Sequence, residues 1–205
     1  TNGVDWVAKT RNAEFPARGG ATALYYDSKL WVIGGYASGY FNDVWYSTNG
    51  VDWTAATRNA EWVARVGAST CVHDGKMWYT GGYGGDDGAN GRDVWNSEDG
   101  VTWTNVTMTA EYSGTIAYRT LLSFDDKLWL LGKSKKVWNS TDGAEWTAVT
   151  LNATALAGAE VILAKDDTIY AFDVYNKKGY SSTDGANWTE ITMGTNLSAR
   201  DYVST

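Results

Sequence analysis

The sequence predicts an all-β protein, a β-propeller of four-stranded antiparallel blades, and two observations carry this prediction. The first is a repeat: the phrase Asn/Asp-Gly-x-x-Trp occurs five times, at intervals of 42 to 50 residues, and ends on Trp6, Trp53, Trp103, Trp146 and Trp188. The second is composition, because the 205 residues include 12 Trp, 13 Tyr and 1 Pro. Strand-rich repeats of this length are typical of propeller blades, and so many aromatic side chains give the fold ample apolar surface to bury.

The second repeat illustrates how the strands of one blade arise. Asp-Gly is a strong hairpin signal, and Asp74-Gly75 and Asp99-Gly100 each lie between two segments rich in apolar and aromatic residues. A long glycine-rich loop separates the two middle segments. We therefore expect four strands in this repeat, at residues 66–72, 77–80, 93–97 and 101–104.

Aligning the repeats predicts one domain over residues 1–205, with four complete blades and a divided fifth. The complete blades are expected at residues 17–56, 64–106, 115–149 and 157–191. The fifth would combine a lone fourth strand in residues 1–10 with a lone first strand in residues 197–205, and its two middle strands are absent. Natural proteins avoid bare sheet edges. The array is therefore expected either to belong to a larger ring or to be completed by copies of the chain, and we favour the larger ring.

Most tryptophans stand at fixed positions of the repeat, which favours a structural role for them. The aromatic residues of the second strands are Trp31, Trp78, Trp129 and Tyr170, and those of the third strands are Trp45, Trp95, Trp138 and Tyr180. A large ring at a fixed place in each blade fills the wedge between neighbouring sheets. Glycine pairs at 34–35 and 81–82 allow close approach of the backbone near the axis. Trp62 departs from these positions.

The first repeat contains Leu30-Trp31-Val32-Ile33-Gly34-Gly35, then Asn42-Asp43-Val44-Trp45, then Trp53-Thr54. This pattern resembles a kelch repeat. Arg18 and Arg65 match the arginine that often opens such repeats. The resemblance, of the galactose oxidase central-domain type, implies a ring of four-stranded blades. The copper site of galactose oxidase requires two histidines, and this chain has only His73. No cofactor is expected.

The Ser-x-Asp/Asn-Gly-x-x-Trp turns resemble the Asp-box turns of sialidase-type propellers, although they are one residue shorter. That resemblance implies structural turns between third and fourth strands, tied by hydrogen bonds of the Ser and Asp side chains. A sialidase-like site also needs an arginine triad. Arg18, Arg65 and Arg200 are candidates, but the third and fourth blades have Ile116 and Ala157 at the aligned positions.

Composition argues against several other classes of protein. The net charge of −7 is opposite to what non-specific nucleic-acid binding needs. A single cysteine, Cys71, excludes an internal disulfide and a multi-cysteine metal site, and its apolar surroundings predict a buried structural thiol. His73 is expected to be an exposed turn residue. No apolar run approaches the roughly 20 residues that span a bilayer.

The predicted binding surface is the loop face, formed by the connections between second and third strands and between blades. Exposed aromatic side chains beside arginine and flexible glycine are typical of recognition surfaces. The candidate ligand-binding residues are Tyr36, Tyr40, Phe41, Trp62, Tyr83, Arg92, Arg18 and Arg65. For Trp62, which aligns with Phe15 and Tyr112, burial between blades is the alternative.

Two further kinds of site are suggested by short motifs. Asp86, Asp87 and Asn90 make a weak calcium candidate, because hard cations prefer carboxylate and carbonyl oxygens, and a flexible polar loop is the favoured alternative. Asn-x-Ser/Thr sequons begin at Asn105, Asn139, Asn152, Asn187 and Asn196. Their use would imply a glycosylated, extracellular or surface protein.

Together these features predict a non-catalytic module, outside the cell or on a cell or virion surface, that presents its loops to a protein or glycan. One alternative is a structural repeat module of a surface layer, sheath, fibre or virion appendage, with copies of itself as partners. A second alternative is a fragment of a sialidase-like glycosidase.

Overall fold

The computed structural model describes residues 5–84, 91–110, 120–132, 136–152, 156, 159, 161–173 and 176–192. Within these residues, every regular element is a β-strand. The strands form antiparallel sheets of four, and in each sheet they follow one another in chain order.

The strands of the four blades have the following bounds. Blade 1 contains β1 (Thr22–Tyr26), β2 (Lys29–Tyr36), β3 (Tyr40–Ser47) and β4 (Thr54–Thr57). Blade 2 contains β5 (Val66–His73), β6 (Lys76–Tyr83), β7 (Val94–Ser97) and β8 (Thr104–Thr107). Blade 3 contains β9 (Thr120–Phe124), β10 (Lys127–Gly132), β11 (Lys136–Ser140) and β12 (Thr147–Val149). Blade 4 contains β13 (Val161–Lys165), β14 (Thr168–Asp173), β15 (Lys178–Ser182) and β16 (Thr189–Ile191).

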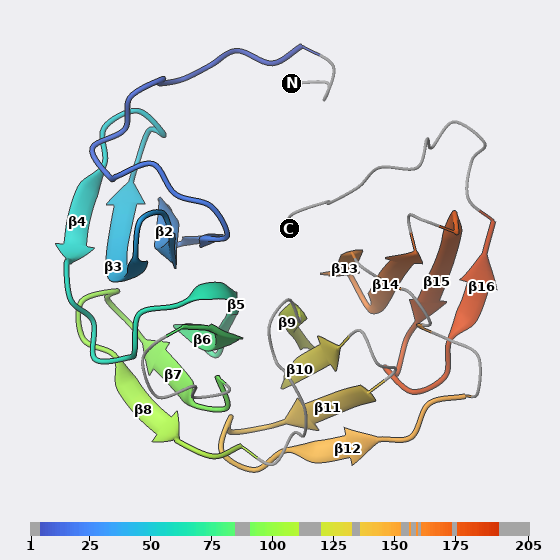
Figure 1. Cartoon of the computed structure of the whole chain (residues 1–205). Coiled ribbons are helices and arrows are strands. Elements are labelled where there is room, and N and C mark those ends of the chain that lie inside the picture. The colour runs from blue at the N-terminus through green and yellow to red at the C-terminus, as the bar shows by residue number, and fades with distance from the viewer. Residues whose placement is uncertain are drawn as a thin grey trace.

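The four sheets fan out around a common centre in an open arc (Figure 1). The first strand of each blade lies nearest the centre and the fourth lies outermost. This arrangement confirms the predicted fold: the protein is a β-propeller of four-stranded antiparallel blades.

The hairpins form where the sequence predicts them, but the fourth strands begin later than expected. In blade 2 the strand starts at Thr104 rather than at residue 101. The reason is the side chain of Asp99, whose Oδ1 accepts the backbone N–H groups of Val101 and Thr102 at 2.8 and 2.9 Å. These bonds extend the turn to Trp103, which is buried there and donates its indole N–H to Gly100 O at 3.3 Å.

The divided fifth blade is not formed by the described residues. Residues 5–9, expected as a lone fourth strand, contain no strand. A strand needs a neighbour for its backbone hydrogen bonds, and none of the described strands pairs with this segment. Its expected counterpart, residues 197–205, lies outside the described residues.

Neighbouring blades interlock through a tryptophan and a glycine, and the same contact occurs three times. The second-strand indole of one blade lies on the turn glycine of the next, in the pairs Trp31–Gly100, Trp78–Gly143 and Trp129–Gly185. A Cβ placed at any of these glycines would overlap the six-membered ring above it. The glycines also have φ values of +71° to +75°, which L-residues rarely adopt.

The innermost strands add hydrogen bonds between blades. Thr22 Oγ1 and Thr70 Oγ1 are 2.9 Å apart across β1 and β5. Leu121 donates its backbone N–H to Ser69 Oγ at 2.8 Å across β5 and β9. Polar side chains near the axis therefore join blades whose outer parts are held by aromatic packing.

Candidate functional site

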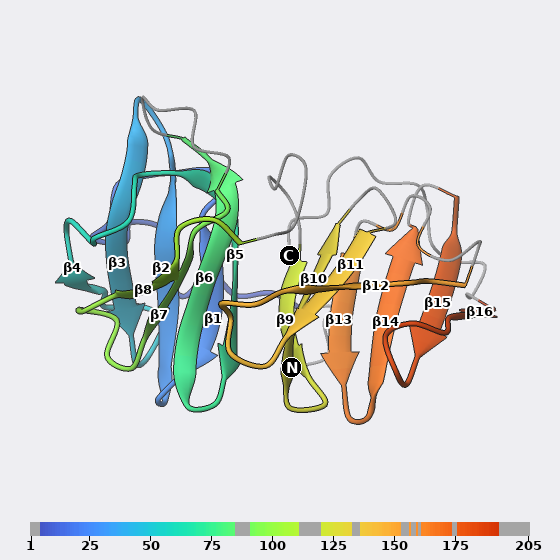
Figure 2. The same cartoon turned by 90° about the horizontal axis from the view of Figure 1, so that it is seen from below.

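Two different kinds of connection lie at the two ends of the blades. The hairpins β5–β6, β9–β10 and β13–β14 project from one face of the arc, whereas the connection between β2 and β3 lies on the opposite face (Figure 2). This second face is the loop face predicted from the sequence. Three of the predicted ligand-binding residues meet there.

The tyrosine cluster, which consists of Tyr36, Tyr40 and Tyr83, is the main feature of the loop face. The ring centroids of Tyr36 and Tyr40 are 5.0 Å apart, and those of Tyr40 and Tyr83 are 6.1 Å apart in an edge-to-face contact. Their exposed fractions are 46%, 37% and 61%, respectively. Burial and the neighbouring phenols of Tyr83 and Tyr36 raise the pKa of Tyr40. The Tyr40 hydroxyl therefore stays protonated at neutral pH and can donate a hydrogen bond.

Glycines at the ends of the second strands position these tyrosines. Tyr36 and Tyr83 each follow a Gly-Gly pair, and the register of β2 against β3 shifts between Ile33 and Gly35. At Gly35 φ is +109°, and an added Cβ would lie 3.1 Å from Gly19 O. The backbone can thus turn Tyr36 toward Tyr40 only because no side chain occupies this position.

Blades 1 and 2 are joined directly beneath the cluster. The N–H of Gly35 donates to Arg65 O at 2.9 Å, and the N–H of Arg65 donates to Phe41 O at 3.1 Å. These bonds connect the strand ends that carry Tyr36 and Tyr40 to the segment that enters blade 2. The cluster therefore rests on a fixed backbone framework.

Arg18 and Arg65 do not belong to the exposed binding surface, so the prediction for them is wrong. Arg65 donates two hydrogen bonds of 2.6 Å to Asp93, and a third of 3.1 Å to Gly81 O. Arg18 bonds in the same way to Asp43 and to Gly34 O. Both guanidinium groups are buried, because each neutralises a carboxylate from its own blade. They tie the start of the blade to its third strand.

Asp43 and Asp93 were missed as partners of these arginines. Burial of Asp93 raises its pKa, but the hydrogen bonds and charge of Arg65 outweigh burial and leave the pKa below its ordinary value. The available signal was a recurring Asp-Val-Trp at the third strand of each of the first two blades. Each aspartate also accepts the indole N–H of the following tryptophan, Trp45 or Trp95, at 2.7 Å.

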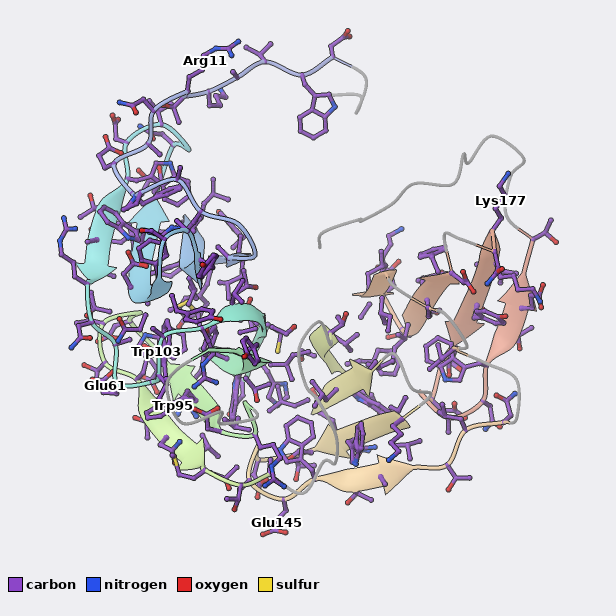
Figure 3. All side chains as sticks on the ribbon, in the orientation of Figure 1. Arg11, Glu61, Trp95, Trp103, Glu145 and Lys177 are labelled. Carbon is purple, nitrogen blue, oxygen red and sulfur yellow. The ribbon has the colours of Figure 1, made fainter. Side chains whose placement is uncertain are left out.

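Trp62 is also absent from the exposed surface, and its predicted alternative, burial between blades, is what the structure shows. Its exposed fraction is 1%, and its ring lies 4.5 Å from that of Tyr79. The indole also meets Trp103 edge-on at 6.2 Å. Trp62 lies on the connection from β4 to β5. Glu61, on the same connection, accepts the backbone N–H of Trp103 in blade 2 at 3.2 Å, and the two residues lie close together in Figure 3.

The remaining predicted loop-face residues have mixed positions. Phe41 is half-buried beneath Arg18, whose guanidinium carbon is 4.1 Å from the ring centroid. Arg92 is exposed and lies two residues before the third strand of blade 2. The calcium candidates Asp86, Asp87 and Asn90 lie outside the described residues. Among the residues that the structure describes, no group of three or more His, Cys, Asp or Glu could hold a metal ion.

The sequon asparagines differ in how free their side chains are. Asn105 and Asn139 are half-buried on strands, and Asn196 lies outside the described residues. Asn187 is exposed and donates to Asp184 at 2.7 Å. Asn152 is exposed too, but its amide bonds both the N–H and the C=O of Trp188 at 3.1 and 2.9 Å.

Cys71 and His73 both lie on β5. Cys71 is half-buried rather than fully buried as predicted, and burial raises the pKa of its thiol, so the thiol stays protonated. His73 is half-buried, not exposed as predicted, because its Nδ1 lies 2.9 Å from Ser123 Oγ of the next blade. No helix in the described parts of the chain is long and apolar enough to cross a membrane.

Comparison with known proteins agrees with the blade geometry. A family model described as the DUF6242 beta propeller domain matches residues 68–161, from within β5 to the first residue of β13. No curated protein matches the chain. The middle of this propeller, comprising most of blade 2 and all of blade 3, is therefore similar to the DUF6242 beta propeller domain.

Proposed function

We propose that this protein is a non-catalytic binding module whose tyrosine cluster binds a glycan. The observation that supports the proposal is the mutual contact of three exposed tyrosines, supplied by two neighbouring blades, on the loop face. An aromatic face carries partial negative charge and attracts the C–H groups of a sugar ring, and a phenol hydroxyl can bond the sugar hydroxyls.

The size of the cluster favours a saccharide over a protein surface. A tyrosine offers about 150–250 Å² of surface, so three rings with exposed fractions of 46%, 37% and 61% present on the order of 300 Å². A stable protein interface needs about 800 Å² from each partner. One or two sugar rings match the smaller area, and a protein partner would need a larger surface around the cluster.

The buried ion pairs favour binding over catalysis. A sialidase-like site needs arginines that are free to meet a substrate carboxylate, whereas Arg18 and Arg65 are each held by an aspartate. Asp93 is unsuited to donating a proton, because Arg65 keeps its pKa below the ordinary value. An extracellular or surface setting, where glycans are abundant, is part of the same proposal.

A glycan array tests the proposal. The labelled protein is applied to the array, and each glycan that binds is then titrated by calorimetry against wild type, Tyr40→Ser and Tyr83→Ser. We expect each tyrosine substitution to weaken binding at least about tenfold, because aromatic side chains at the centre of a site contribute more than 1.4 kcal/mol.

Met108→Ser is the matched control, since Met108 is an exposed apolar residue outside the cluster. This variant should bind as wild type does. An array with no bound glycan, or glycans that bind the tyrosine variants as tightly as wild type, would contradict the proposal. If the same tyrosine substitutions instead weakened binding to a purified protein, the ligand class would be wrong.

A further inference from the structure

The two sides of the arc that face no other blade differ from every inner side. In blade 2, β6 is buried on both faces, from Met77 through Gly82. In blade 4, β14 alternates instead: Ile169 and Ala171 are buried in a cluster with residues of blade 3, whereas Tyr170 and Phe172 are half-exposed. Blades 1 and 4 therefore each leave exposed one sheet face whose counterpart in the inner blades is buried.

The trailing face, on blade 4, consists of Leu163, Tyr170 and Phe172. Tyr170 occupies the position of the three interlocking tryptophans, and it stacks only on Phe172 among the described rings. Leu163 pairs with Tyr170 across the strands and is 42% exposed. At the same position of blade 3, Leu122 is buried. The trailing face therefore carries the aromatic ring of the tryptophan–glycine contact, but no turn glycine of a following blade lies against it.

The leading face, on blade 1, consists of Leu30, Val32 and Gly50. Leu30 is 42% exposed, whereas the residues at its position in the other blades, Met77, Leu128 and Ile169, are all 0% exposed. Gly50 has the turn conformation of the covered glycines, with φ of +72°, but a Cβ placed there would meet only Leu30 Cδ1, at 3.6 Å. The leading face is the glycine half of an interlock without an indole above it.

The outer part of the leading side is already covered by the chain itself. Glu14 accepts the N–H of Trp53 at 2.8 Å, as Glu61 does for Trp103 between blades 1 and 2. Phe15 meets Trp53 edge-on at 5.1 Å, in the place that Trp62 takes beside Trp103. Only the inner part, where a second-strand aromatic belongs, is left open.

We infer that the leading and trailing faces are two halves of one interface, and that a second copy of this chain docks on the first head to tail. Tyr170 of one copy would lie on Gly50 of the next, and Leu30 and Leu163 would be buried together. The occupant is a second copy because both halves are present on this chain, and because their geometry continues the interlock that joins its own blades three times. Arg11 and Lys177, at opposite sides of the opening in Figure 3, mark the two ends that would meet.

Analytical ultracentrifugation of wild type and two blocked variants tests the inference. Gly50→Asn fills the leading face, and asparagine tolerates a positive φ better than other side chains. Tyr170→Ser removes the aromatic ring from the trailing face, and Leu163→Ser is a second substitution there in case the first unfolds the blade. Gly75→Asn is the control, since Gly75 also has a positive φ, of +66°, but its Cβ would meet no atom within 4 Å. Thermal melting checks that each variant is folded.

Wild type and Gly75→Asn should gain mass with concentration, because head-to-tail contacts either close a ring or extend. Gly50→Asn and Tyr170→Ser should each stay monomeric at concentrations where wild type associates. Mixed in equal amounts, these two variants should form a dimer and nothing larger, because each retains the half that the other lacks. A wild type that stays monomeric at every concentration, or a mixture that does not pair, would overturn the inference. Continued self-association of either blocked variant alone would overturn it too.

Discussion

Single residues set how closely the blades pack, and the turn glycines are the tightest positions. Gly100, Gly143 and Gly185 each meet a tryptophan ring from the preceding blade, whereas Gly50 has the same backbone conformation and an open surface. Glycine is therefore favoured at position 50 only by its positive φ, whereas at the other three turns a side chain would also collide with a tryptophan ring. The two kinds of turn can be compared within one protein.

We predict that Gly143→Ala destabilises the fold far more than Gly50→Ala. Both substitutions place a Cβ at positive φ, which costs about 1–2 kcal/mol. At Gly143 the new carbon would also lie 2.9 Å from Cη2 of Trp78, and such overpacking adds about 1–3 kcal/mol. Urea unfolding of both variants at low protein concentration measures the difference. Equal losses of stability would mean that the indole does not lie on this turn.

A second residue-scale prediction concerns Tyr79, which is fully buried between blades 1 and 2. Its hydroxyl has no hydrogen-bond partner within the described residues, and burial raises its pKa. A buried hydroxyl without a partner contributes no favourable term to offset its desolvation. Tyr79→Phe should therefore leave the free energy of unfolding within about 0.5 kcal/mol of wild type, or increase it. A loss of 1.5 kcal/mol or more on denaturant titration would show that the hydroxyl is bonded.

At the scale of elements, the turn between third and fourth strands is built the same way in all four blades. A serine Oγ accepts the glycine N–H, as in Ser140 and Gly143 at 2.8 Å. A carboxylate or amide oxygen then accepts the next two N–H groups, as Asp142 Oδ1 does at 2.8 and 3.0 Å. These are the side-chain hydrogen bonds that the sequence predicted for the turns. Blade 1 makes the same turn with Asn49, so the geometry does not require a charge.

Protonation of these aspartates should weaken the blades at low pH. Hydrogen bonds from Asn187 and Ala186 lower the pKa of Asp184 from 3.8 to about 2, and those from Glu145 and Ala144 lower the pKa of Asp142. Because the folded-state pKa is depressed, the unfolded chain binds more protons as pH falls. The stabilisation is complete above about pH 4 and is lost toward pH 2.

The double variant Asp142→Asn/Asp184→Asn tests this prediction. Asparagine keeps the acceptor oxygen, as Asn49 shows, and cannot be protonated in this range. Its stability at pH 7 should stay close to that of wild type, and its loss of stability between pH 4 and 2 should be smaller. Acid titrations of both proteins, followed by circular dichroism, make the comparison. Identical acid transitions would show that the turn carboxylates do not contribute.

At the scale of the whole molecule, the repeat predicted the architecture well because each blade repeats its turn glycines and aromatic rings in register. Contacts between residues that are far apart in the chain were harder to predict. Arg18 and Arg65 were assigned to the surface because their partners, Asp43 and Asp93, lie 25 and 28 residues away in the chain. Trp62 was misplaced for the same reason, since only the inward path of its connection buries it.

The contacts within the tyrosine cluster were also not predicted from the sequence. Tyr36, Tyr40 and Tyr83 were predicted as separate members of one face. Their mutual contact depends on the glycine at position 35 and on the angle between two blades. Neither the register shift nor that angle is encoded in a local pattern. The sequence could therefore predict that these tyrosines share one face, but not that their aromatic rings form one continuous surface.

The account depends on radial packing of blade against blade, and a double-mutant cycle between Trp78 and Gly143 tests it most directly. Phenylalanine lacks the outer ring of tryptophan, so Trp78→Phe should make room for the methyl group of Gly143→Ala. We predict that the two substitutions together cost at least about 1 kcal/mol less than the sum of their separate effects on unfolding. Additivity within about 0.5 kcal/mol would show that these residues, 65 positions apart, do not touch, and would contradict the propeller packing described here.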